Sequence, residues 1–279
     1  MRRSTLIMAA VVLLAAGARA EAPAGASAGR PPVMLEDLTW LEVRARMRGG
    51  ATAVIVPTGG TEQNGPHMVL GKHNAIVRHT AERIARALGR TLVAPVIAHV
   101  PEGRIEPPRD HMRFAGTLSL PEPVFEALLE ATARSLRAHG FRTIFLLGDS
   151  GGNQRAQARV AKRLTRRWRR RGVRVVHVGA YYAANGQAAW LRRAGETRRS
   201  IGNHAGIRDT SELMAIRPEG VRTRLLAPGA MPRLRRPGHD GDPSRASAER
   251  GRALIGLKVE AALRQMRAVL AEQRAESRR

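Results

Sequence analysis

Short runs of β-branched and other apolar residues alternate with amphipathic stretches along this chain of 279 residues. Such alternation is typical of a parallel β-sheet with helices on both faces. Only 3% of the residues are aromatic, so Val, Leu, Ile and Ala must fill the core, which favours helix-on-sheet packing. The chain is therefore predicted to be an α/β protein. We predict strands at 53–57, 91–96, 143–147 and 173–178, and helices at 75–88, 122–139, 154–171 and 246–274.

Polar motifs follow two of the predicted strands directly. The first strand runs into TGGTE, which ends at Glu62, and the third runs into GDSGGN at 148–153. The carboxyl ends of the strands line the ligand crevice of an open parallel sheet, so we expect both motifs to meet at one edge. That edge is the predicted active site.

The first twenty residues have the features of a secretory signal peptide. Arg2 and Arg3 precede an apolar stretch at 6–16, and residues 18–20 form an A-x-A cleavage site. The alternative of a membrane anchor is disfavoured, because a spanning helix needs ~20 apolar residues and this stretch is shorter. The mature protein is therefore predicted to be periplasmic or secreted, with no stable membrane anchor. The arginine pair leaves both Sec and twin-arginine export open.

The rest of the chain is predicted to be one domain. Residues 21–33 are rich in Ala, Gly and Pro, and we predict that they form a disordered lead-in. Residues 34–279 show no internal repeat and no low-complexity spacer, so a single domain at 34–279 is expected.

The formal net charge of +25 raises the question of a polyanionic partner. Only three of the 48 basic residues are lysines, and GC-rich coding also produces such an arginine bias. Many of the arginines fall on predicted helix faces, where a solvated polar face is the default. No helix-turn-helix, zinc-finger or aromatic basic motif accompanies them, so we predict no specific nucleic-acid partner.

The segment TEQNGPHMVLGKH places Glu62, His67 and His73 within twelve residues of a predicted loop. A carboxylate and two imidazoles in such a loop can converge on a divalent ion. Because the chain has no cysteine, His, Asp, Glu and water must supply the ligands, and zinc is the first expectation and manganese the second. The alternative interpretation is that Glu62 caps the following chain and that the histidines lie at the surface.

Two further segments carry ionisable side chains. GDSGGN provides Asp149 and Ser150 and meets the G-x-S-x-G pattern of a nucleophile elbow, so a serine hydrolase that uses Ser150 is an alternative prediction. HAGIRDTSELM provides His204 and Asp209 as possible partners of Ser150. In serine hydrolases with a nucleophile elbow, however, the acid usually comes before the His in the chain. Asp209 also fits a helix N-cap, with Glu212 three residues later.

Six ordered blocks of the sequence together resemble the creatininase-like family of metal-dependent amidohydrolases. They are LTWLEV (38–43), VPTGGTEQNGPH (56–67), HMRFAGTLSLPE (111–122), RSLRAHGFRTIFLLGDSGGN (134–153), HAGIRDTS (204–211) and GDPSRASAERG (241–251). The resemblance implies a three-layer α/β/α fold with a mostly parallel central sheet, and a homo-oligomer. It also implies a divalent metal centre that activates water to cleave a non-peptide C–N bond.

Several positions depart from the family's ligand motifs. Glu62 is retained in the motif E-Q-H-G-P-H, but Asn64 replaces its first His and His73 replaces the Asp that follows. Ser150 stands at the His of the family's N-G-H-G-G-N motif, and Asp209 at the Glu of its H-x-G-x-x-E-T-S motif. His and Asp are able ligands, so the resemblance implies a rearranged site.

From this resemblance we predict a ligand set and two catalytic residues. The side chains predicted to contact the metal are Glu62, His73, Asp149 and Asp209. His204 matches the family's late histidine and is predicted to act as general acid/base or to orient the substrate carbonyl, with His111 supporting it. The loss of a bridging Asp at position 73 favours one metal ion over two.

The predicted function is hydrolysis of a non-peptide C–N bond in a small linear or cyclic amide. A catalytically inactive protein that binds a small ligand on the same fold is the alternative, because the family's histidines are missing at Asn64 and Ser150. The substrate would be a small molecule in either case.

Overall fold

The computed structural model describes residues 31–276. The predicted signal peptide and residues 21–30 of the predicted lead-in lie outside the described residues. Val33, at the end of that lead-in, is buried, and its carbonyl accepts a hydrogen bond from the Val93 N–H at 2.9 Å. None of the helices between residues 31 and 276 is long and apolar enough to cross a membrane.

A parallel sheet of four strands, in the order β2-β1-β3-β4, lies at the centre of the domain. The strands are β1 (Ala53–Thr58), β2 (Thr91–Val93), β3 (Thr143–Gly148) and β4 (Arg174–His177). All four were predicted, but β2 ends three residues early, because Pro95 has no N–H to continue the ladder. Thr58 and Gly148 are paired, so β1 and β3 end side by side.

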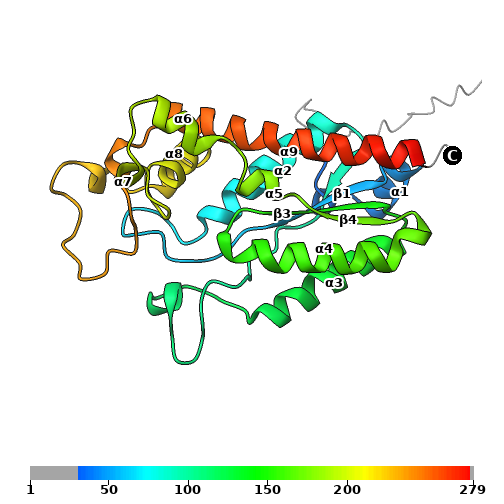
Figure 1. Ribbon diagram of the computed structural model, residues 1–279, viewed down its shortest axis with the longest axis horizontal. Coiled ribbons are helices and arrows are strands. Elements are labelled where there is room, and N and C mark those ends of the chain that lie inside the picture. The colour runs from blue at the N-terminus through cyan, green and yellow to red at the C-terminus, as the bar shows by residue number, and fades with distance from the viewer. Residues whose placement is uncertain (1–30, 277–279) are drawn as a thin grey trace, which may run out of the picture. The chain divides into compact units, whose positions relative to one another are not determined.

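Helices cover both faces of this sheet, which confirms the predicted three-layer α/β/α fold (Figure 1). Val54 and Val56 of β1 pack with the helices α3 and α4, whereas Ile55 between them packs with α2 and α9 on the other face. The helices are α1 (Trp40–Arg48), α2 (Lys72–Leu88), α3 (Glu122–Ala138), α4 (Gln154–Trp168), α5 (Gly179–Tyr182), α6 (Gln187–Arg193), α7 (Arg198–Ile201), α8 (Ile207–Ile216) and α9 (Ala248–Glu276).

The first turn of α2 differs from the sequence prediction. The helix begins at Lys72 instead of residue 75, so His73 lies on a helix and not in the loop after Glu62. Residue 71 is Gly and provides no side-chain cap; instead, Asn74 holds the turn because its Oδ1 accepts a hydrogen bond from Gly60 N–H at 3.0 Å.

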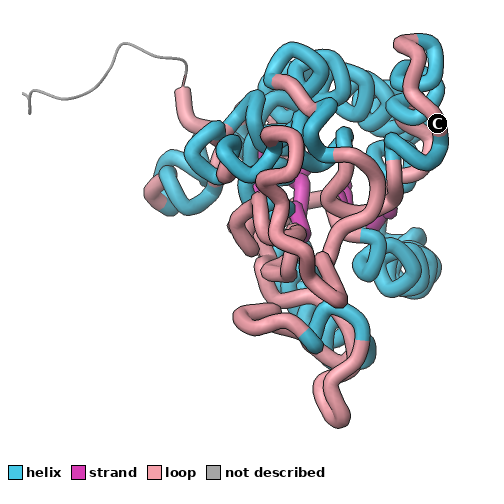
Figure 2. Tube along the Cα trace, turned by 90° about the vertical axis from the view of Figure 1, so that its left-hand side faces the viewer, coloured by secondary structure: helices cyan, strands magenta, loops and turns pink. Residues whose placement is uncertain are grey.

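Long loops and the short helices α5 to α8 gather at the carboxyl ends of the strands. Figure 2 looks at this edge and shows loops in front of the strands. The short helices were not predicted, because they have too few turns for a periodic apolar pattern.

Candidate functional site

A cavity of about 350 Å³ lies at the carboxyl ends of the strands. Its walls come from the loops after β1 and β3, the segment 101–111, and the helices α2, α8 and α9. Glu62 and Asp149 both line it, so the two motifs that follow β1 and β3 meet as expected. All six predicted site residues line this cavity: Glu62, His73, His111, Asp149, His204 and Asp209.

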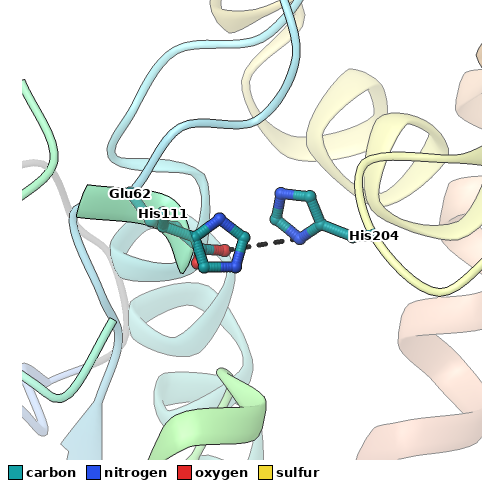
Figure 3. Close-up of side chains that lie close together, drawn as sticks. All are labelled: Glu62, His111 and His204. Atoms are coloured by element: carbon teal, nitrogen blue, oxygen red, sulfur yellow. Dashed lines mark ion pairs between the residues drawn. The ribbon is translucent and has the colours of Figure 1, made fainter. Parts of the chain in front are cut away.

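Three of these side chains have the spacing of metal ligands, and we call them the histidine cluster: Glu62, His111 and His204 (Figure 3). His111 Nε2 lies 3.3 Å from Glu62 Oε2, and His204 Nδ1 lies 3.7 Å from Glu62 Oε1. One potential ligand atom from each lies within 4.8 Å of the others. Among residues 31–276, no other group of three or more His, Asp or Glu side chains has this spacing.

Gln63 holds the two imidazoles of the histidine cluster. Its Nε2 lies 2.8 Å from His111 Nδ1 and 3.1 Å from His204 Nε2. Its Oε1 accepts a hydrogen bond from Gly65 N–H at 3.0 Å, which fixes the orientation of the amide. When His204 Nε2 donates to the backbone carbonyl of Gln63 at 3.0 Å, the lone pair of Nδ1 faces Glu62, and the Gln63 amide N–H donates to His111 Nδ1 and not to His204.

A second group of side chains fills the other side of the cavity, and we call it the lysine network: His73, Asp149, Glu212 and Lys258. Asp149 accepts hydrogen bonds from His73 Nδ1 at 2.7 Å, Lys258 Nζ at 2.8 Å and Tyr181 Oη at 2.7 Å. Lys258 also donates to Glu212 at 2.9 Å. Every carboxylate of this network therefore has a protein cation beside it.

His73 is a cation in this arrangement. Burial and the Lys72 charge lower its pKa, but hydrogen bonds to Asp149 and Glu62 raise it to about 9. Its Nδ1 contacts Asp149, and its Nε2 lies 2.8 Å from Glu62 Oε1. With both ring nitrogens donating, neither has a lone pair for a metal. His73 thus bridges Asp149 and Glu62, and its role as a metal contact stays a prediction.

The remaining predicted contacts are also paired with protein groups. Asp209 accepts a hydrogen bond from Lys72 Nζ at 3.1 Å and from Ala205 N–H at 2.7 Å. It lies in the first turn of α8 and Gly206 is the N-cap, so the N-cap alternative is wrong. The predicted ligand set and the histidine cluster thus share Glu62 alone.

Two buried lysines were missed by the sequence analysis. Lys72 is fully buried in the first turn of α2, where the helix dipole disfavours a positive charge. Burial lowers the pKa of Lys72, but Asp209 and Glu62 raise it above its ordinary value. Lys258 is 5% exposed. A signal was available: only Lys72, Lys162 and Lys258 break the arginine bias, and two of these three line the cavity.

A buried carboxyl group that was not predicted, Glu102, also faces the cavity. Burial, and then the charge of Glu62, raise the pKa of Glu102 to about 9, so this group is neutral at pH 7. Its Oε2 accepts a hydrogen bond from Ser150 Oγ at 3.2 Å, and its Oε1 has no hydrogen-bond partner.

The catalytic triad of the serine-hydrolase alternative is not assembled. The hydroxyl of Ser150 donates to Glu102, and none of the described histidines hydrogen-bonds to it. His204 contacts Gln63, and Asp209 contacts Lys72, so no hydrogen bond joins the three side chains. Ser150 has φ −94° and ψ 149°, an ordinary extended conformation, whereas a nucleophile elbow is a strained turn.

Two polar residues brace the loop that carries Glu62. Asn64 donates hydrogen bonds to the carbonyls of Glu62 at 2.8 Å and Val69 at 3.2 Å. His67 Nε2 lies 3.0 Å from Thr210 Oγ1 on α8. Burial and the nearby His239 lower the pKa of His67 to about 4, so it is neutral at pH 7.

The fold and sequence match known proteins over most of the chain. A curated relative from Mycobacterium tuberculosis (strain CDC 1551 / Oshkosh), a mycofactocin precursor peptide peptidase, is 29% identical over 77% of this chain and 84% of its own. A manganese form of creatininase has a TM-score of 0.68 at 23% identity over 85% of this chain and 98% of its own. A Zn-Zn creatininase variant has a TM-score of 0.66 at 23% identity over 86% of this chain and 98% of its own.

The family model for creatinine amidohydrolases matches residues 36–266, which lie within the predicted domain. That match covers far more than half of the sequence and confirms the resemblance that the six sequence blocks indicated. The chain belongs to the creatininase family and is an enzyme, a hydrolase of the amidohydrolase type.

Proposed function

We propose that this enzyme hydrolyses a C–N bond in a small amide and that Glu62, His111 and His204 hold its metal ion. The observation that carries the proposal is the spacing of the histidine cluster. It is the part of the cavity in which a carboxylate and two imidazoles approach one another. Glu62 Oε1 also accepts a hydrogen bond from His73 at 2.8 Å, so Oε2, which faces His111, is the oxygen left for an ion.

The donor chemistry of the histidine cluster fits zinc, and manganese is the second choice. One carboxylate and two imidazoles are common ligands of catalytic zinc sites, which leave a position open for water or substrate. Burial and the Lys72 charge lower the pKa of His204 to about 4, which keeps this ring neutral, as a ligand must be. The manganese and Zn-Zn creatininases of the same fold support a divalent ion of this type.

A divalent ion supplies a water of lowered pKa and polarises an amide carbonyl. The residues around the cluster add fixed charges and protons. The ammonium of Lys72 lies 3.8 Å from Glu62 Oε1 and favours negative charge there. Glu102 is neutral, so its carboxyl group can donate a hydrogen bond where a carboxylate could only accept one.

Short peptides are the second candidate class of substrate. The relative from Mycobacterium tuberculosis, similar over 77% of this chain, is a peptide peptidase by name. A peptide bond is an amide bond, so the same cluster can act on it. We further propose that the enzyme is a homo-oligomer, as the family resemblance implies. We also propose that it works in the periplasm or outside the cell, as the signal-like first twenty residues predict.

Metal analysis of His204→Asn and His111→Asn tests the ligand set. Each variant should bind zinc at least about 10–100-fold more weakly than the wild type, the loss seen even when an outer partner of a ligand is removed. Titration with a zinc indicator measures this, and hydrolysis of a panel of small amides and dipeptides should fall in parallel.

His139→Asn is the matched control, because His139 is exposed at the end of α3, outside the cavity. It should bind zinc like the wild type. Unchanged zinc affinity in both cluster variants would show that the metal site is elsewhere. Ligand stabilisation without turnover of any compound in the panel would favour the inactive binding protein.

A further inference from the structure

A second cleft, of about 640 Å³, adjoins the active-site cavity and is lined by four arginines. The four are Arg109, Arg113, Arg235 and Arg236. Three residues, Asp110, His111 and His204, line both spaces. A ligand whose amide lies at the histidine cluster can therefore extend directly into this cleft.

The four arginines have no acidic partners among residues 31–276. Among the described residues, none of their guanidinium groups makes an ion pair or a side-chain hydrogen bond to a carboxylate. Other arginines of the chain do: Arg159 and Arg163 on α4 pair with Glu126 on α3, at 2.7 Å and 3.1 Å. The positive charge of the cleft is thus left uncompensated, although the chain can place glutamates opposite its arginines.

The segment that carries Arg235 and Arg236 is attached to the histidine cluster. Gly238 lies against Gln63, and a Cβ there would come within 2.1 Å of Gln63 Oε1, so a side chain at this position would displace the Gln63 amide. Asp240 Oδ1 accepts hydrogen bonds from the N–H groups of His204 at 2.5 Å and Asn203 at 2.6 Å. The two arginines are therefore within a few residues of two contacts to the site.

The acidic residues of the cleft do not cancel its charge. Asp110 and Asp240 are its two carboxylates, against four guanidinium groups. The carboxylate of Asp240 already accepts hydrogen bonds from Asn203 and His204, so it offers little to the arginines. The cleft is suited to an anion, and arginine binds a carboxylate with paired hydrogen bonds.

We propose that the substrate is an amide that also carries a carboxylate, which binds in the cleft of Arg109, Arg113, Arg235 and Arg236. This inference rests on the proposed function for the position of the amide, which lies at Glu62, His111 and His204. N-acylated amino acids and short peptides with a free carboxyl end belong to this class.

Calorimetric binding of matched probes to the full-length protein tests the inference. N-acetyl-L-alanine carries the carboxylate, and N-acetyl-L-alaninamide is its neutral counterpart. The wild type should prefer the anionic probe, and the preference should weaken at high salt because the arginines are exposed. Arg235→Gln/Arg236→Gln should lower the affinity for the anionic probe roughly 5- to 30-fold and leave the neutral probe unaffected.

Arg169→Gln/Arg170→Gln is the matched control, because it removes the same charge from exposed residues beyond the end of α4. It should change the affinity for the anionic probe by less than about twofold, because screening weakens charges beyond a Debye length. Equal losses in the two double variants would show a general charge effect and overturn the inference. Equal binding of the two probes by the wild type would also overturn it, as would full displacement of N-acetyl-L-alanine by an equal concentration of inorganic phosphate.

The inference and the proposed function fail separately. Retained arginine-dependent binding in a protein that binds no zinc would refute the metal site and leave the carboxylate cleft standing. Zinc binding lost in His204→Asn, together with an unchanged affinity for the anionic probe in Arg235→Gln/Arg236→Gln, would refute the carboxylate cleft and leave the metal site standing.

Discussion

The two sides of the cavity contain similar side chains, but these side chains approach their carboxylates at different distances. In the histidine cluster, the ring atoms of His111 and His204 approach Glu62 at 3.3 Å and 3.7 Å, longer than ordinary hydrogen bonds. In the lysine network, His73 and Lys258 contact Asp149 at 2.7 Å and 2.8 Å. On the first side, Glu62 Oε1 accepts from His73 but, among residues 31–276, Oε2 accepts no hydrogen bond from a cation, whereas both oxygens of Asp149 on the second side accept hydrogen bonds from protein cations.

This difference explains the departures from the family's ligand motifs. His73 stands where the family has an Asp, and its charge joins Glu62 to Asp149. Burial raises the pKa of Asp149, but the charge of Lys258 and the hydrogen bond from His73 hold it well below its usual range. His73 thus balances the two carboxylates that it joins, and a single metal ion stays a prediction.

The largest expected effect comes from removing a cation of the lysine network. Lys258→Met leaves Asp149 and Glu212 buried without their ammonium partner, and we expect it to destabilise the protein by about 3–5 kcal/mol. Urea unfolding measures the loss. Lys162→Met on the exposed surface of α4 is the control and should stay within about 0.5 kcal/mol. A small effect of Lys258→Met would show that Asp149 and Glu212 do not depend on the ammonium of Lys258.

A smaller effect is expected from pH, and it comes from His67 in the loop that carries Glu62. The pKa of His67 is lowered from 6.5 to about 4, so the stability it contributes is complete above pH 6.5 and is lost as pH falls from there towards 4. The loss should reach roughly 3 kcal/mol once the pH is below 4. His73, with its pKa of about 9, is already charged in this window and contributes no change.

Urea unfolding of the metal-free protein at several values of pH checks this expectation. His67→Gln should reduce the dependence on pH between 4 and 6.5, because Gln does not titrate; the part that remains is expected from His204, whose pKa is also lowered to about 4. An unchanged slope in His67→Gln would assign the whole titration to other groups.

The smallest expected effect concerns Ser150, between the two sides. Ser150→Ala removes the hydrogen bond to Glu102, and we expect a loss of about 1 kcal/mol in stability. Amide hydrolysis should persist, since the hydroxyl is not a nucleophile in this site. Labelling of wild-type Ser150 by a fluorophosphonate, together with abolished hydrolysis in Ser150→Ala, would support the alternative function of a serine hydrolase.

Most of the fold was predictable because its strands and helices follow patterns of neighbouring residues in the sequence. The strands at Ala53–Thr58 and Thr143–Gly148 are continuous apolar runs, and the helices at Glu122–Ala138 and Gln154–Trp168 end at Gly or turn residues. Regular alternation of this kind depends on neighbours in the sequence, and so does the position of a motif that directly follows a strand. The edge of the sheet at which the two motifs meet could therefore be predicted together with the fold.

The roles of the site residues were predictable only in part. Glu62 and His204 were recognised by their place in motifs, and His73 was interpreted as a ligand because it is an able ligand at the family's Asp position. Whether an imidazole binds a metal or a carboxylate depends on which partner faces it. For His73 that partner is Asp149, 76 residues away.

The sequence by itself determined the layers of the fold, the edge at which the motifs meet, and membership of the creatininase family. These follow from periodicity and from residues that lie next to one another in the chain. The tertiary structure decided which side chains remain open to a metal and which are neutralised. It did so because charge compensation acts over a few ångströms in space, and Lys258, on the last helix, reaches Asp149 only in the folded protein.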